Sequence, residues 1–104
     1  MKAVLSTMAG LGLALAALGA QAEVTDAMSK AGCMACHAVD KKVIGPSFKD
    51  IAAKYKGQDV LAKLTEKVRK GGSGSFGPVP MAPNTPDKIN DADLKTAIEQ
   101  ILKS

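Results

Sequence analysis

Apolar side chains recur at helical spacing in four stretches of the chain, and breaker or capping residues separate these stretches. The pattern predicts helices over residues 23–35, 47–56, 59–70 and 90–102. Their expected N-caps are Thr25 or Asp26, Ser47, Asp59 and Asn90. Their expected inward faces are Ala27, Ala31 and Met34; Phe48, Ile51, Ala52 and Tyr55; Leu61, Leu64 and Val68; and Leu94, Ile98, Ile101 and Leu102. No alternating run is long enough for a strand, so the sequence predicts an all-α fold.

The first 22 residues follow another pattern. Lys2 gives a positive start, the run from Ala3 to Ala20 carries no charge, and Ala20-Gln21-Ala22 has the form of a signal-peptidase site. We therefore expect a cleaved signal peptide at 1–22, a single domain at 23–104 and a periplasmic location. An uncleaved membrane anchor is the alternative, but the apolar run is short for a span. No later apolar run is long enough, so we expect no stable membrane insertion after cleavage.

The domain at 23–104 has little aromatic material for a core. It contains Phe48, Tyr55 and Phe76, and the chain has no Trp. Small exported domains usually need a disulfide, a metal or a similar staple. The two cysteines lie only three positions apart, and a disulfide between them would constrain little. A large apolar cofactor would supply the missing volume.

The stretch Cys33-Met34-Ala35-Cys36-His37 is C-x-x-C-H, the attachment signature of a covalent c-type haem. Two thiols about one helical turn apart can reach the two vinyl groups at one edge of a porphyrin. The adjacent His37 can then bind the iron through a neutral imidazole nitrogen. The sequence thus predicts one haem c, with thioethers at Cys33 and Cys36 and an axial ligand at His37.

The second axial ligand is expected from the glycine- and proline-rich loop at 71–86. His37 is the only histidine of the chain, so a methionine is the natural candidate. Met34 lies between the two cysteines, and Met28 lies on the first predicted helix, where it packs against the haem edge or the last helix. Elimination leaves Met81, which three nearby prolines would hold in place. The alternative is that Met81 only packs in the loop and that lysine or water binds the iron.

With these residues in hand, the chain resembles the small class I bacterial cytochromes c of the c-551/c-552 type. The shared motifs are Gly32–His37, Val43–Pro46, Gly71–Gly74 and Phe76–Asn84. The resemblance implies about four short helices wrapped around one covalently attached haem. It also implies a monomeric periplasmic electron carrier of respiration or denitrification, not an enzyme.

The resemblance also implies residue roles next to the ligands. The carbonyl of Pro46 would accept a hydrogen bond from the His37 ring, and the Asn84 amide would hydrogen-bond the Met81 sulfur. One departure is Phe76, where relatives often carry a Trp that donates to a haem propionate. A phenyl ring has no donor, so that propionate would need another partner.

Other functions make different demands on the iron. A gas-binding or peroxidase-like protein needs an open coordination position, which remains the alternative if Met81 is not a permanent ligand. A peroxidase also needs a distal acid or base, and the chain has no second histidine. A thioredoxin-like thiol oxidoreductase needs a βαβ pattern, which is missing here.

The chain carries 14 Lys and Arg against 10 Asp and Glu, and the basic residues gather over 41–70. They form either ordinary solvated helix faces or a docking surface for acidic redox proteins. Such partners would be a quinol-oxidising cytochrome complex as donor and a terminal reductase, oxidase or peroxidase as acceptor. We expect no nucleic-acid binding, because the charge is modest and no aromatic residues interleave with it.

Overall fold

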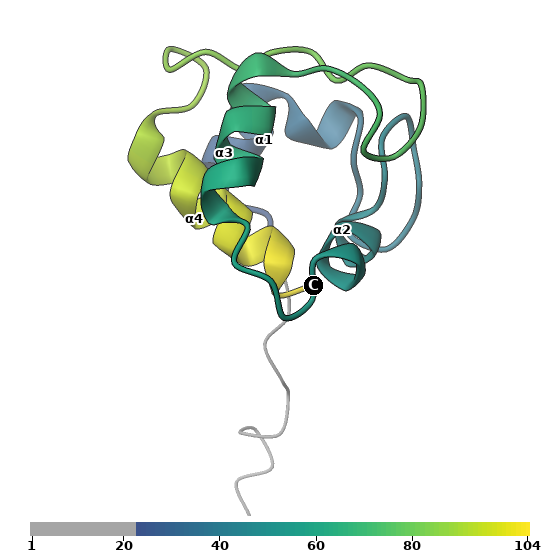
Figure 1. The fold of residues 1–104 in the computed structure, drawn as a ribbon. Coiled ribbons are helices and arrows are strands. Elements are labelled where there is room, and N and C mark those ends of the chain that lie inside the picture. The colour runs from purple at the N-terminus through teal and green to yellow at the C-terminus, as the bar shows by residue number, and fades with distance from the viewer. Residues whose placement is uncertain (1–22) are drawn as a thin grey trace, which may run out of the picture.

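The computed structural model describes residues 23–104, which form four α-helices and one short 3-10 helix (Figure 1). The elements are α1 (Asp26–Ala31), η2 (Cys33–Ala35), α2 (Phe48–Lys54), α3 (Leu61–Lys70) and α4 (Asp91–Leu102). Within this range there is no strand, only two isolated bridges. No helix in the same range is long and apolar enough to cross a membrane. The all-α prediction is confirmed, while the predicted signal peptide lies outside the described residues.

Helix α4 is the element against which the other helices pack. It contacts α1, α2 and α3, and Figure 1 shows it at the lower left of the fold, crossing behind the lower part of α3. The core cluster consists of Met28 from α1, Phe48 from α2, Ile89, and Leu94, Ala97 and Ile98 from α4. Each of these side chains is at most 4% exposed. The loop between α3 and α4, drawn in green, runs along the top of the fold in Figure 1.

Three helices begin at the predicted polar caps. In each case the side chain accepts a hydrogen bond from the backbone N–H three residues later: Thr25 from Met28 (3.2 Å), Ser47 from Asp50 (3.0 Å) and Asn90 from Asp93 (2.8 Å). The predicted cap at Asp59 is wrong. Helix α3 begins after Val60, no side chain caps it, and Val60 is itself buried. Burial of an apolar side chain therefore sets this helix start instead of a polar cap.

The first helix is shorter than predicted. Helix α1 ends at Ala31 because Gly32 adopts the left-handed conformation (φ +88°), which directs its N–H to the carbonyls of Met28 and Ser29. The chain then starts afresh as η2, so the C-x-x-C-H motif lies on a separate tight turn and not on the end of a continuous helix.

Candidate haem site

The Cys33 and Cys36 thiols and the His37 imidazole all belong to one tight turn. Cys33 opens η2, and its carbonyl accepts hydrogen bonds from the backbone N–H groups of Cys36 (3.2 Å) and His37 (3.0 Å). Both cysteines are partly buried, and no disulfide joins them. Burial raises the pKa of the Cys33 thiol above its ordinary value, and the nearby Cys36 thiol adds a smaller effect in the same direction.

The ring of His37 is fixed by a hydrogen bond to the backbone. Its Nδ1 lies 2.7 Å from the carbonyl oxygen of Pro46. A carbonyl can only accept, so Nδ1 carries the proton and donates, and Nε2 keeps its lone pair. This is the tautomer that a metal-binding histidine needs, and the same hydrogen bond fixes the orientation of the ring.

Two further contacts hold the imidazole, and sequence reasoning did not find them. A Cβ added to Gly45 would lie 2.6 Å from Cε1 of His37 and 3.0 Å from Nδ1, so the Gly45 backbone lies directly against the ring. The rings of Phe48 and His37 are stacked, with centroids 5.6 Å apart and an interplanar angle of 25°. The available signal was the Val43–Pro46 motif, from which only the role of the Pro46 carbonyl was predicted.

Met81 lies in the second half of the 71–86 loop, which returns past the end of α3. We call this returning segment, residues 81–86, the Met81 limb. Its backbone N–H and C=O pair with the C=O and N–H of Gly72, each at 2.9 Å. Gly71 has φ +69° and ψ −157°, a combination open essentially only to glycine. A Cβ there would strike the carbonyl oxygen of Met81 and would come within 2.9 Å of the Pro83 nitrogen. The backbone around Met81 is therefore packed against that of α3.

Asn84 fastens the same limb to α3. Its backbone N–H donates to the carbonyl of Val68 at 2.9 Å, and its side-chain Nδ2 donates to the carbonyls of Ala82 (3.2 Å) and Val68 (3.4 Å). Val68 lies in the last turn of α3, where carbonyls lack partners within the helix. Asn84 thus provides the hydrogen-bond donor that the Val68 carbonyl lacks within the helix. Its hydrogen bond to the Met81 sulfur stays a prediction.

The other two methionines of the described range lie elsewhere. Met28 is 1% exposed in the core, and its Sδ accepts a hydrogen bond from the Thr25 N–H at 3.5 Å. Met34 is partly buried and packs against the same core. Of the methionines within 23–104, Met81 alone lies on a loop outside the core cluster.

Phe76 lies at the tip of the loop and is 40% exposed. The ammonium of Lys54 lies 4.4 Å from its ring centroid and donates a hydrogen bond to the Ser75 carbonyl. Other basic residues also have partners within the chain, such as Lys70, whose ammonium lies 2.7 Å from Glu66. The basic stretch is therefore partly occupied with internal contacts.

The donor set and the surface around it fit a haem. Two thiols, one oriented imidazole and one thioether are the groups by which haem c is held. Large apolar side chains are exposed in the segments that carry these groups: Val43 (47%), Ile44 (54%), Phe76 (40%) and Val79 (55%). Apolar surface of this kind is typical of a place that a large apolar group covers.

Residues 21–103 match the family model described as cytochrome c, and the chain belongs to this family. It is 52% identical over 77 residues to cytochrome c2 of Rubrivivax gelatinosus, which covers 73% of this chain and 91% of the relative. It is 41% identical over 90 residues to cytochrome c-551 of Pseudomonas aeruginosa, covering 85% and 84%. The crystal structure of wild-type Nitrosomonas europaea cytochrome c552 superposes with a TM-score of 0.66 at 45% identity, over 74% of this chain and 94% of that one.

The predicted resemblance is therefore confirmed. The chain is a class I cytochrome c of the c-551/c-552 type, an electron carrier and not an enzyme. Its cofactor is covalent haem c, and its partners are redox proteins.

Proposed function

We propose that the chain is exported, loses residues 1–22, and carries single electrons in the periplasm as a monomer with a low-spin haem ligated by His37 and Met81. When bound, haem c supplies a one-electron couple between ferric and ferrous iron. Cys33 and Cys36 would hold it covalently. The observation that carries the proposal is the 2.7 Å contact between His37 Nδ1 and the Pro46 carbonyl, which leaves Nε2 free for the iron.

The role of Met81 is supported by how its backbone is held. The pairing with Gly72 and the flanking prolines at 78, 80 and 83 limit the conformations of the loop, so a weak thioether can stay in one place. Asn84 would orient the sulfur by a hydrogen bond. A thioether ligand in apolar surroundings favours the reduced state, so we expect a positive reduction potential.

The partners would be acidic-surfaced redox proteins. Lys41, Lys42, Lys49 and Lys56 are exposed and can steer such a partner. The donor would be a quinol-oxidising cytochrome complex, and the acceptor a terminal reductase, oxidase or peroxidase. Electron exchange should slow as the ionic strength rises, because screening weakens the attraction between the two surfaces.

The test is the visible spectrum of the mature holoprotein in both oxidation states, with and without carbon monoxide. We expect a low-spin spectrum that carbon monoxide leaves unchanged and a weak long-wavelength sulfur-to-iron band in the oxidised state. That band should vanish in Met81→Ala and persist in Met34→Leu, the matched control. A high-spin spectrum that shifts with carbon monoxide would overturn the His37/Met81 ligation and favour gas binding or peroxidase-like chemistry at an open iron.

A further inference from the structure

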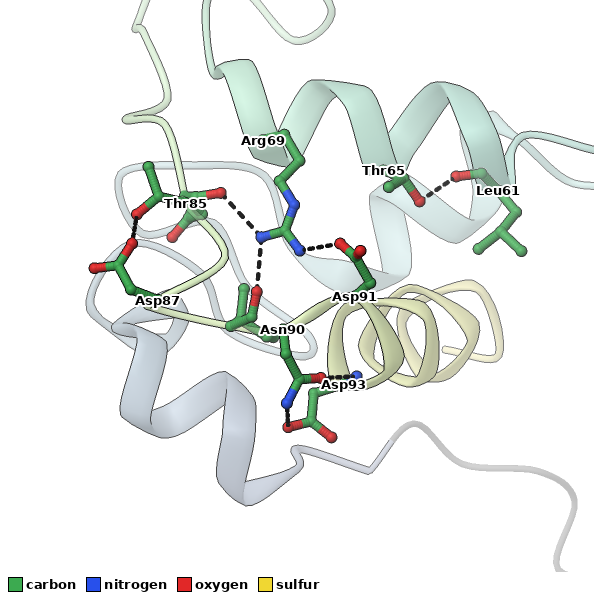
Figure 2. Close-up of polar contacts among 10 residues, drawn as sticks. Leu61, Thr65, Arg69, Thr85, Asp87, Asn90, Asp91 and Asp93 are labelled. Atoms are coloured by element: carbon green, nitrogen blue, oxygen red, sulfur yellow. Dashed lines mark hydrogen bonds and ion pairs between the residues drawn. The ribbon is translucent and has the colours of Figure 1, made fainter.

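Arg69 is held unusually firmly for a basic residue in the last turn of a helix. Cations near a helix C-terminus are commonly solvated and interact with the helix dipole. The Arg69 side chain is only 17% exposed, and it reaches away from α3 into the turn that leads to α4 (Figure 2). Its position in the sequence therefore does not explain where the guanidinium lies.

The guanidinium makes three hydrogen bonds to the segment 84–91. Nη1 donates to the carbonyls of Ile89 (2.7 Å) and Asn84 (3.2 Å), and Nη2 donates to Oδ1 of Asp91 (2.6 Å). Two of the three acceptors are thus main-chain atoms five residues apart in the sequence. The planar guanidinium has N–H donors in fixed directions and can bind two carbonyls and a carboxylate at once. A lysine ammonium does this less well.

The carbonyls matter more to this arrangement than the ion pair. The Asp91 side chain is 91% exposed, and exposed ion pairs contribute little. The carbonyl of Asn84, in contrast, belongs to the residue whose N–H and side chain bind the Val68 carbonyl. Arg69 therefore fixes the same peptide segment from its other side.

The Met81 limb is therefore held by contacts at three points. The limb is joined to the end of α3 at Met81 itself, through Gly72, and at Asn84, through Val68. Arg69 adds the third point and ties the limb to the start of α4. Without it, the segment between Asn84 and Asp91 would be held to α3 only by the Asn84–Val68 hydrogen bonds and by the packing of Ile89 in the core.

We infer that Arg69 is a positioning residue for Met81: by closing the segment 84–91 onto α3, it keeps the thioether from leaving the iron. The inference rests on the proposed His37/Met81 ligation. Imidazole added to the solution would report the departure of the Met81 thioether directly, because it can bind the ferric iron only when Met81 has moved away. The affinity of the oxidised holoprotein for imidazole therefore reports how often the loop opens.

The experiment compares imidazole affinity, read from visible absorbance, in the wild type and a set of variants. We expect about tenfold tighter binding in Arg69→Ala, with the sulfur-to-iron band lost at correspondingly lower imidazole concentration. Arg69→Lys should fall between the two. Asp91→Asn should stay within about twofold of the wild type, because it leaves both carbonyl contacts in place.

Global stability needs its own control. Lys95→Gly weakens α4 at an exposed mid-helix position without touching the loop. It should lower the denaturation midpoint but leave the imidazole affinity at the wild-type value. If Arg69→Ala yields no holoprotein, Arg69→Lys and Arg69→Gln serve the same comparison.

Two results would overturn the inference: unchanged imidazole affinity in the Arg69 variants, or equally tightened binding in Lys95→Gly. Failure of the ligation itself has a different signature. In that case the wild type would lack the sulfur-to-iron band and Met81→Ala would bind imidazole as the wild type does, which would overturn both proposals.

Discussion

The two segments that supply the proposed iron ligands are held in different ways. The ring of His37 is fixed through its own side-chain atoms, by the Pro46 carbonyl, the Gly45 backbone and the Phe48 ring. The contacts described for Met81 are all made by its backbone. A strong imidazole ligand thus has its orientation set directly, whereas a weak thioether depends on a loop that is fastened to α3. Substitutions near His37 should therefore act through side-chain volume, and substitutions near Met81 should act through backbone conformation.

The largest effect is expected at Gly71. In Gly71→Ala the new Cβ would occupy a conformation open only to glycine and would strike the Met81 carbonyl. We expect the free energy of unfolding to fall by about 4 kcal/mol, combining backbone strain with overpacking. The sulfur-to-iron band should also weaken or vanish. Guanidinium denaturation and the oxidised visible spectrum measure the two effects.

Gly77→Ala is the matched control for this substitution. Gly77 also has a positive φ (+106°), but a Cβ there meets no atom within 4 Å. It should cost only backbone strain, about 1–2 kcal/mol, and leave the band in place. Equal effects of both variants on the band would show that general loop strain, not the contact with Met81, is responsible.

The next largest effect is expected at Gly45. Its φ is not positive, so alanine brings no backbone strain, only the 2.6 Å approach to the His37 ring. We expect a loss of about 3 kcal/mol in unfolding free energy from overpacking and a weakened hydrogen bond to Pro46. The Nδ1 proton of His37, followed by NMR, should exchange faster with solvent. Unchanged exchange would contradict the idea that Gly45 holds the ring.

A smaller effect is expected from Phe48→Leu. The side chain is 2% exposed, and leucine keeps most of its apolar contacts but loses the stacking on His37. We expect the free energy of unfolding to fall by about 1.5 kcal/mol, with the sulfur-to-iron band unchanged. Loss of that band in Phe48→Leu would mean that the two ligand segments are not independent.

The smallest effect is expected at a helix cap remote from both segments. Thr25→Ala removes the side-chain acceptor for the Met28 N–H at the start of α1. We expect a loss of about 1 kcal/mol in unfolding free energy. Neither the His37 proton exchange nor the sulfur-to-iron band should change, and a change in either would show that these probes follow global stability.

The parts of this protein that sequence could predict are encoded by neighbouring residues. The cysteine pair with His37, the caps at Thr25, Ser47 and Asn90, and the apolar face of α4 all depend on spacings of a few positions. The end of α1 was missed because Gly32 has a left-handed conformation that its neighbours do not require. Local pattern therefore gave the helices and the covalent attachment, but not their exact limits.

The rest depends on residues that are distant along the chain. Arg69 reaches Asn84 and Ile89, which lie 15 and 20 positions later, and nothing near it in sequence indicates this. The close approach of Gly71 to Met81 is of the same kind. Such contacts appear only when the loop is folded back on α3, so they require the three-dimensional structure.

The central position of α4 also has a consequence for how the chain is made. This helix follows the other three along the sequence, yet each of them packs against it. A growing chain that has released only α1, α2 and α3 therefore lacks the surface on which its core assembles. The core of this domain can therefore be completed only after α4, which ends at Leu102, has been synthesised.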